Sequence, residues 1–253
     1  MLSPSDMNGK TVLVTGAAAG LGRATAIRLA RAGADIALLD INAEGLAQTA
    51  ETIHSLGSNT LIQPLDLSDT ANCGPAIAAA VDHFGRLDAL CNVAAVFIPT
   101  HSHEMSDDDW DKSLAVNLSA PFKLIRAAIP HLIEAEGAIV NVTSCAAFTG
   151  QAYLAAYSST KAALTHMTKS LAMEYMHKPI RINAVAPGGM MTALAAGLRN
   201  LKDPDPSLLG RISPLRGVVE VDDVAEMVAY LASDAARGYH GACINIDNGI
   251  TAG

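Results

Sequence analysis

Short apolar runs alternate with longer Ala- and Leu-rich segments along the whole chain. The short runs are apolar throughout, which is typical of parallel strands covered by helices on both faces. The longer segments have helical spacing, and several end in Gly or Pro, as at Ala32-Gly33-Ala34 and Lys178-Pro179. The pattern predicts strands at Thr11–Thr15, Asp35–Asp40, Thr60–Leu65, Ala89–Val93, Ala138–Thr143, Arg181–Ala186 and Cys243–Ile246.

This alternation predicts an α/β fold: a single-domain, Rossmann-type, doubly wound parallel sheet of about seven strands flanked by helices. No linker, repeat or low-complexity tract divides the 253 residues, so we expect one domain over 1–253. Residues 188–214 differ, because they lose strand character and gather Gly, Pro, Met and short Leu clusters. Long irregular segments in compact domains are often functional, so we expect a substrate-binding lid there rather than a plain surface insertion.

Composition narrows the class of protein. Half the residues are apolar, and the net charge of −8 comes without an acidic tail or a basic stripe, which disfavours nucleic acid and anionic membranes as partners. The four cysteines lie far apart and form no metal-binding or disulfide pattern. Neither a signal peptide nor an apolar run of about 18 residues is evident, so we expect a cytoplasmic protein.

A glycine-rich segment follows the first predicted strand. Gly16, Gly20 and Gly22 precede a helical pattern, and such a loop lets the backbone approach a pyrophosphate at the positive end of a helix. Three glycines alone also fit an ordinary turn between strand and helix. Asp40 ends the second strand about 20 residues further on, where a carboxylate can bind both ribose hydroxyls of NAD and repel the 2′-phosphate of NADP. Its alternative role is to cap the next helix.

Tyr157 and Lys161 lie four residues apart in a predicted helix, Ala152–Tyr175, and therefore share one face. A neighbouring ammonium favours the phenolate over the phenol, which would suit Tyr157 to proton transfer. The same spacing also occurs on ordinary solvated helix faces. His101 and His103 lack the surrounding ligands of a metal site, so we expect surface loop histidines and no metal. Asp107-Asp108-Asp109 after Ser106 predicts a capped helix start.

With these motifs in order, the chain resembles the short-chain dehydrogenase/reductase family over nearly its whole length. The family's glycine motif corresponds to Thr15 through Gly22 and its Tyr-x-x-x-Lys to Tyr157 and Lys161. The resemblance implies a catalytic set of Asn117, Ser144, Tyr157 and Lys161, with Ser144, Gln151 and Tyr157 at the substrate. It implies that NAD is bound by Gly16, Ala19, Gly20, Leu21, Gly22, Asp40, Ile41, Asp66, Leu67, Asn92, Ala94, Tyr157, Lys161, Pro187, Gly188, Met190 and Thr192.

Two positions depart from the family pattern. Ala95 stands where the family often has Gly, which adds a methyl group near the nicotinamide. Asn248 replaces a Gly in the C-terminal Asp-Gly-Gly, and Asn tolerates the left-handed backbone better than most residues.

The resemblance implies an NAD-dependent oxidoreductase (EC 1.1.1.-) that interconverts a secondary alcohol and a ketone by hydride transfer, with Tyr157 as acid and base. Lys161 would hold the ribose and lower the pKa of Tyr157, and Asn117 would fix a relay water. Apolar residues near the site favour an apolar or alicyclic alcohol, including a hydroxysteroid-like alcohol or a cyclic diol. These residues are Val96, Phe97, Ala146, Phe148, Leu154, Met190, Met191 and Leu194.

Two alternatives remain beside this reading: a 3-ketoacyl carrier reductase, which would usually need NADP, and a non-catalytic NAD-binding regulator. The family also implies a homotetramer. Excess apolar surface on the helices predicted around Ala115–Leu132 and Ala152–Tyr175 is in keeping with contacts between subunits.

Overall fold

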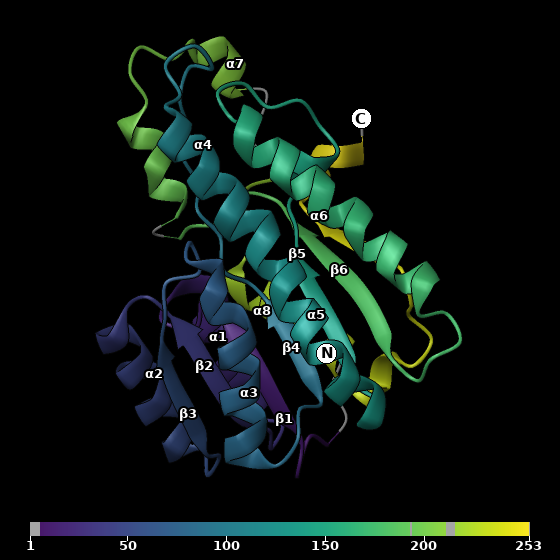
Figure 1. Ribbon diagram of the computed structural model, residues 1–253. Helices are drawn as coiled ribbons and strands as arrows, with labels where there is room; N and C mark the ends of the chain where they lie inside the picture. The colour runs from purple at the N-terminus through teal and green to yellow at the C-terminus, as the bar shows by residue number, and fades with distance from the viewer. Residues whose placement is uncertain (1–5, 193, 211–215, 253) are drawn as a thin grey trace.

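A computed structural model describes residues 6–192, 194–210 and 216–252 of the chain. Its seven parallel strands form one sheet in the order β3-β2-β1-β4-β5-β6-β7 (Figure 1). The strands are β1 (Thr11–Thr15), β2 (Asp35–Asp40), β3 (Thr60–Pro64), β4 (Ala89–Asn92), β5 (Ala138–Val142), β6 (Arg181–Pro187) and β7 (Cys243–Ile246). The helices are α1 (Gly20–Ala30), α2 (Ala43–Ser55), α3 (Cys73–Phe84), α4 (Asp107–Leu114), α5 (Ala120–Glu134), α6 (Ala155–Glu174), α7 (Pro206–Gly210) and α8 (Val221–Ala232). The predicted α/β class, sheet type and strand number are confirmed.

Helices cover both faces of the sheet (Figure 1). Successive residues of a strand point to opposite faces, so Val12 and Val14 of β1 pack with apolar residues of α1, α2 and α8, whereas Leu13 packs with those of α3, α5 and α6. This double burial explains why the strands read as continuous apolar runs.

The chain reverses its direction of travel across the sheet at β1, which pairs with β2 on one side and β4 on the other. The helices that follow β1 and β4 therefore lie on opposite faces, and a crevice opens at the carboxyl ends of these two strands. Residues after β4, β5 and β6 reach the same edge, because all strands are parallel.

The predicted strands agree with those observed to within one residue at each end. Predicted residues Leu65, Val93 and Thr143 lie just past their strands, and β6 continues to Pro187. At Val93 the backbone N–H donates to the Thr15 hydroxyl at 2.9 Å instead of continuing the strand ladder.

Two helix starts differ from the sequence prediction. The helix predicted from Ala152 begins at Ala155, because Tyr153 has a φ of 68° and Leu154 is not helical, with φ −118° and ψ 28°. The helix expected around Ala115–Leu132 begins with a π-helical turn over Ala115–Ser119 and continues as α5. Within the described residues, no helix combines the length and apolar character needed to span a membrane.

Candidate active site

The glycine loop after β1 is packed tightly against the start of α1. Gly16 has a φ of 71°, and a Cβ on Gly22 would lie 2.0 Å from the Gly16 carbonyl oxygen. A side chain at Gly22 would therefore push the helix away from the loop, and a Cβ on Gly16 would lie 3.0 Å from Ala94 Cα in the turn after β4. Ala19 is the N-cap of α1, and its methyl side chain cannot accept the first N–H groups of this helix. Such a helix end suits a phosphate.

Asp40 is fixed at the end of β2 by backbone groups. Its Oδ2 accepts the Ala18 N–H at 3.1 Å and its Oδ1 accepts the Asn42 N–H at 3.0 Å. The cap of α2 is Asn42, whose Oδ1 accepts the Gly45 N–H at 3.0 Å. The alternative that Asp40 caps the helix is therefore wrong, and its carboxylate is held at the rim of the cleft beside the glycine loop.

At the crevice, a side chain that the sequence analysis did not single out joins the end of β1 to the turn after β4. The Thr15 hydroxyl accepts the N–H groups of Val93 at 2.9 Å and Ala94 at 3.0 Å. Asn92 lies beneath this turn and donates through Nδ2 to Asn141 Oδ1 at 2.9 Å. Asn92 is buried and does not line the cleft, so its place is under the predicted cofactor site rather than in it.

Tyr157 and Lys161 of α6 face Ser144, which follows β5, across the same cleft. Lys161 Nζ lies 5.7 Å from the centre of the Tyr157 ring and donates to the Val142 carbonyl at 2.8 Å. Burial lowers the pKa of Lys161 to about 8. Burial raises the pKa of Tyr157 to about 12, and hydrogen bonding by Ser144 acts in the opposite direction. The three polar groups thus lie together in a poorly solvated end of the cleft.

Two of the predicted catalytic residues have structural bonds of their own. Ser144 Oγ accepts the Ala146 N–H at 3.1 Å, which is the turn bond that the sequence allows. Asn117 lies on the π-helical turn and bonds across to the loop after β4: its Oδ1 accepts the Val96 N–H at 2.8 Å, and its Nδ2 donates to the Val96 carbonyl at 2.9 Å. Asn117 thereby joins the π-helical turn to the wall of the site without lining the cleft.

Most of the predicted site residues meet in two adjoining clefts. The first is lined by predicted residues Gly16, Ala19, Gly20, Leu21, Gly22, Asp40, Ala94, Ser144, Tyr157, Lys161, Pro187, Gly188, Met190 and Thr192. Ile41, Asp66 and Leu67 line the second, which shares Gly16, Asp40 and Ala94 with the first. Residues lining a cleft that sequence reasoning did not assign include Val142, Thr143 and Lys112. The sequence gives no sign that Lys112 lines a cleft, because its position there depends on how α4 packs.

The expected substrate wall is reproduced only in part. Met190 and Leu194 line the first cleft and Val96 lines the second, but Met191 is 75% exposed. Gln151 donates weakly to Cys145 Sγ and Thr149 Oγ1, both at 3.5 Å, and does not line either cleft. Ala95, the departure from the family pattern, lines both clefts.

The glycine cradle, the uncapped helix end and the fixed carboxylate fit a dinucleotide, and Ser144, Tyr157 and Lys161 stand at the other end of the same cleft. Fold and site thus define a Rossmann-type oxidoreductase. The chain belongs to the short-chain dehydrogenase/reductase family. A family description headed Enoyl-(Acyl carrier protein) reductase matches residues 16–251.

Two relatives of known name cover almost the whole chain. The 2,5-dichloro-2,5-cyclohexadiene-1,4-diol dehydrogenase of Sphingobium indicum is 37% identical over 248 residues, which are 97% of each protein. The cis-4-hydroxycyclohexanecarboxylate dehydrogenase of Sinomonas cyclohexanicum is 36% identical over 245 residues, which are 96% of this chain and 97% of the relative. Among solved structures, a short-chain dehydrogenase from Mycobacterium paratuberculosis bound to NAD superimposes with a TM-score of 0.92 at 26% identity, covering 98% of this chain and 100% of the other.

Proposed function

We propose that the protein is an NAD-dependent dehydrogenase that oxidises secondary alcohols to ketones, and reduces the ketones in the reverse direction. The observation that carries the proposal is the single cleft that joins Ser144, Tyr157 and Lys161 to the glycine loop and Asp40. Bound NAD would accept the hydride from the carbinol carbon. The protein's own residues would bind the alcohol, orient it and remove its proton.

Tyr157 is the proposed proton acceptor for the alcohol hydroxyl, and Ser144 the second hydrogen-bonding group on the same oxygen. Burial raises the pKa of Tyr157 to about 12. Bringing it to about 8 requires roughly 5 kcal/mol of stabilisation of the phenolate. Positive charge on Lys161 and on bound NAD would supply that stabilisation, and exclusion of water would strengthen it.

The proposed preference for NAD over NADP rests on Asp40. Its carboxylate is held by two backbone N–H groups, so it cannot easily turn away from the ribose site. A 2′-phosphate there would meet an uncompensated negative charge.

We propose an apolar, alicyclic alcohol as substrate. Met190 and Leu194 give the reacting end of the cleft an apolar wall, and two relatives are named for ring alcohols. Further support comes from Phe97, whose ring packs edge-on to the Tyr157 ring with centroids 4.9 Å apart.

The test is the rate of NADH formation with cyclohexanol, cyclohexane-1,2-diol and a linear polyol, measured with NAD and with NADP. Wild type should turn over a ring alcohol with NAD. Tyr157→Phe should lower kcat at least 100-fold, because it deletes the group that transfers the proton. Tyr239→Phe serves as the matched control, since it deletes a phenol hydroxyl at the opposite end of the sheet and should leave the rate unchanged.

The alternatives predict different outcomes. Turnover only with NADPH and a 3-ketoacyl thioester would favour a ketoacyl carrier reductase and overturn the argument from Asp40. NAD binding by calorimetry without turnover of any alcohol would favour the non-catalytic regulator.

A further inference from the structure

Tyr153 adopts an unusual backbone conformation immediately before the helix that carries Tyr157. Its φ of 68° lies in the left-handed region, which bulky residues rarely occupy. Such a conformation persists only when surrounding contacts hold it. One contact is made by the main chain: the Thr100 N–H donates to the Tyr153 carbonyl at 3.0 Å and joins the loop after β4 to the loop before α6.

The Tyr153 side chain reaches a third segment. Its phenol oxygen accepts the Asp205 N–H at 2.8 Å. The His101 ring packs against the Tyr153 ring with centroids 4.9 Å apart, and His101 Nε2 lies 3.0 Å from the Lys202 carbonyl. A carbonyl only accepts, so His101 donates from Nε2. Two rings packed edge to face therefore hold the main chain of 202–205 by one donor and one acceptor.

The segment held by these rings leads back to the reacting end of the cleft. Leu194 lines the cleft, and Gly197 lies over Phe97, where a Cβ would be in van der Waals contact with the Phe97 ring at 3.4 Å. Phe97 in turn contacts the Tyr157 ring. Residues 194–205 thus run from the cleft wall, over Phe97, to the two rings.

Residues before and after this segment are also held in place. Met190 and Val219 form a parallel bridge. Asn248 Nδ2 donates to the carbonyls of Gly217 at 2.9 Å and Val218 at 3.0 Å. Residues 202–205 lie between these two fixed points, and the contacts at Lys202 and Asp205 hold them.

We propose that Tyr153 and His101, which we call the ring clasp, are positioning residues that determine substrate size by holding residues 194–205 against Phe97 as the outer wall of the pocket. The inference rests on the proposed alcohol dehydrogenase function. A wall held in place gives a compact alicyclic alcohol contact on both sides and excludes a larger one.

Two variants remove one contact each and keep both rings. Tyr153→Phe removes the acceptor for the Asp205 N–H, and His101→Phe removes the donor to the Lys202 carbonyl. Each should raise KM for cyclohexanol about threefold to tenfold without lowering kcat, the range expected for loss of one hydrogen bond. KM for the larger 2-decalol should stay unchanged or fall. His101→Gln, which keeps a side-chain donor, should recover part of the loss, and Tyr239→Phe should change neither value.

Hydrogen exchange supplies a readout that needs no turnover. In protein free of substrate, the amides of residues 202–208 should exchange faster in Tyr153→Phe and His101→Phe than in wild type or Tyr239→Phe. Unchanged exchange would overturn the clasp itself. Faster exchange with an unchanged preference for cyclohexanol over 2-decalol would overturn its role in specificity. If wild type oxidises no alcohol, the proposed function fails together with the size selection, and exchange still decides whether the clasp holds the segment.

Discussion

Lys161 is a buried amine, and loss of solvent around its charge lowers its pKa. Only 2% of the side chain is exposed, and burial lowers its pKa from 10.5 to about 8. Because the native pKa lies below that of the unfolded chain, the unfolded state holds more protons between about pH 8 and 10.5. The contribution of Lys161 to the free energy of unfolding therefore rises with pH through this window.

Replacing Lys161 by Met removes the charge and keeps most of the shape. Without cofactor at pH 7, Lys161→Met should unfold with about 1–3 kcal/mol more free energy than wild type, less whatever the lost bond to Val142 contributes. As pH rises to 10.5, the free energy of unfolding of wild type should increase relative to that of the variant, so the advantage of the variant should shrink. Urea unfolding at both pH values measures it, and a difference that does not change with pH would contradict the pKa argument.

The residues that could be read from the sequence are those whose neighbours lie close in the chain. Asp40 is the last residue of its strand, and Tyr157 and Lys161 share one helix face, so their positions follow from local structure. The left-handed φ of Tyr153 could not be predicted, because it depends on contacts from Thr100 and Asp205. The bonds of Asn117 to Val96 likewise depend on how α4 and α5 pack on the loop after β4.

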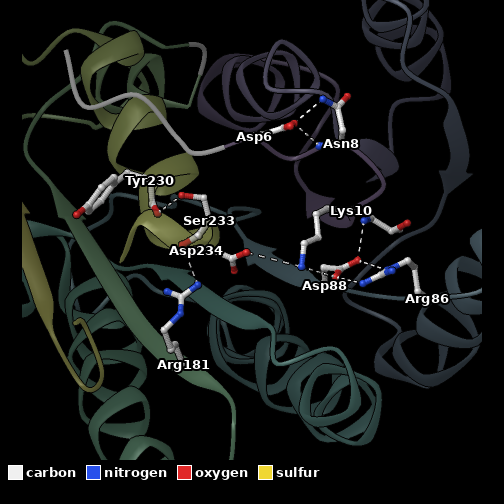
Figure 2. A network of polar contacts seen from close by, with 10 residues as sticks. Asp6, Asn8, Lys10, Arg86, Asp88, Arg181, Tyr230, Ser233 and Asp234 are labelled. Atoms are coloured by element: carbon white, nitrogen blue, oxygen red, sulfur yellow. Dashed lines mark hydrogen bonds and ion pairs between the residues drawn. The ribbon is translucent and has the colours of Figure 1, made fainter. Parts of the chain in front are cut away.

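At the scale of elements, the end of α8 is held by one side chain of β6. Arg181 Nη1 donates to the Leu231 carbonyl at 2.7 Å. Its Nη2 donates to the Ser233 carbonyl at 2.9 Å (Figure 2), so one guanidinium satisfies two carbonyls at the end of the helix. The last carbonyls of a helix have no partner within it, and a planar donor group can bond two of them at once.

Arg181→Lys should lower the free energy of unfolding by about 1–2 kcal/mol, because an ammonium on a shorter side chain cannot reach both carbonyls. Urea unfolding measures the loss. Arg237→Lys, a change at an exposed position in the turn after α8, is the control and should cost less than about 0.5 kcal/mol. Equal losses in the two variants would show that the carbonyl bonds of Arg181 contribute nothing special.

The strands themselves were predicted well, since burial on both faces leaves a continuous apolar run that needs no knowledge of partners. The starts of α5 and α6 were not. A π-helical turn and a left-handed residue both arise where a helix approaches the cleft, and tertiary contacts override local helix preference there.

At the scale of the whole molecule, a charge cluster lies at the edge of the sheet opposite the cleft. Asp88 precedes β4 and is only 4% exposed. Its carboxylate accepts the Thr11 N–H at 2.9 Å and two bonds from Arg86 at 2.7 and 2.6 Å, and lies 3.3 Å from Lys10 Nζ (Figure 2). It therefore fixes the amino ends of β1 and β4 relative to each other.

Asp88→Asn should lower the free energy of unfolding by about 1–3 kcal/mol, since the amide nitrogen cannot accept from the buried Thr11 N–H or from Arg86. The Kd for NAD should stay unchanged, because the cleft lies at the other edge of the sheet. Asp234→Asn is the matched control: Asp234 lies 3.8 Å from the same Lys10 but is 68% exposed, so its loss should cost less than about 0.5 kcal/mol. A weaker NAD complex in Asp88→Asn would show that strain at one edge of the sheet reaches the other.

Because the chain reverses at β1, the two halves of the sequence contribute different parts of the clefts. The loop after β1, the end of β2 and the loop after β3 supply the glycine cradle, Asp40 and Asp66, whereas the segments after β4, β5 and β6 supply most of the wall near Tyr157. Loops tolerate substitution better than the strands that support them, so changes in the later loops, away from Ala94 that lies against Gly16, can reshape the wall near Tyr157 while the glycine loop and Asp40 stay as they are.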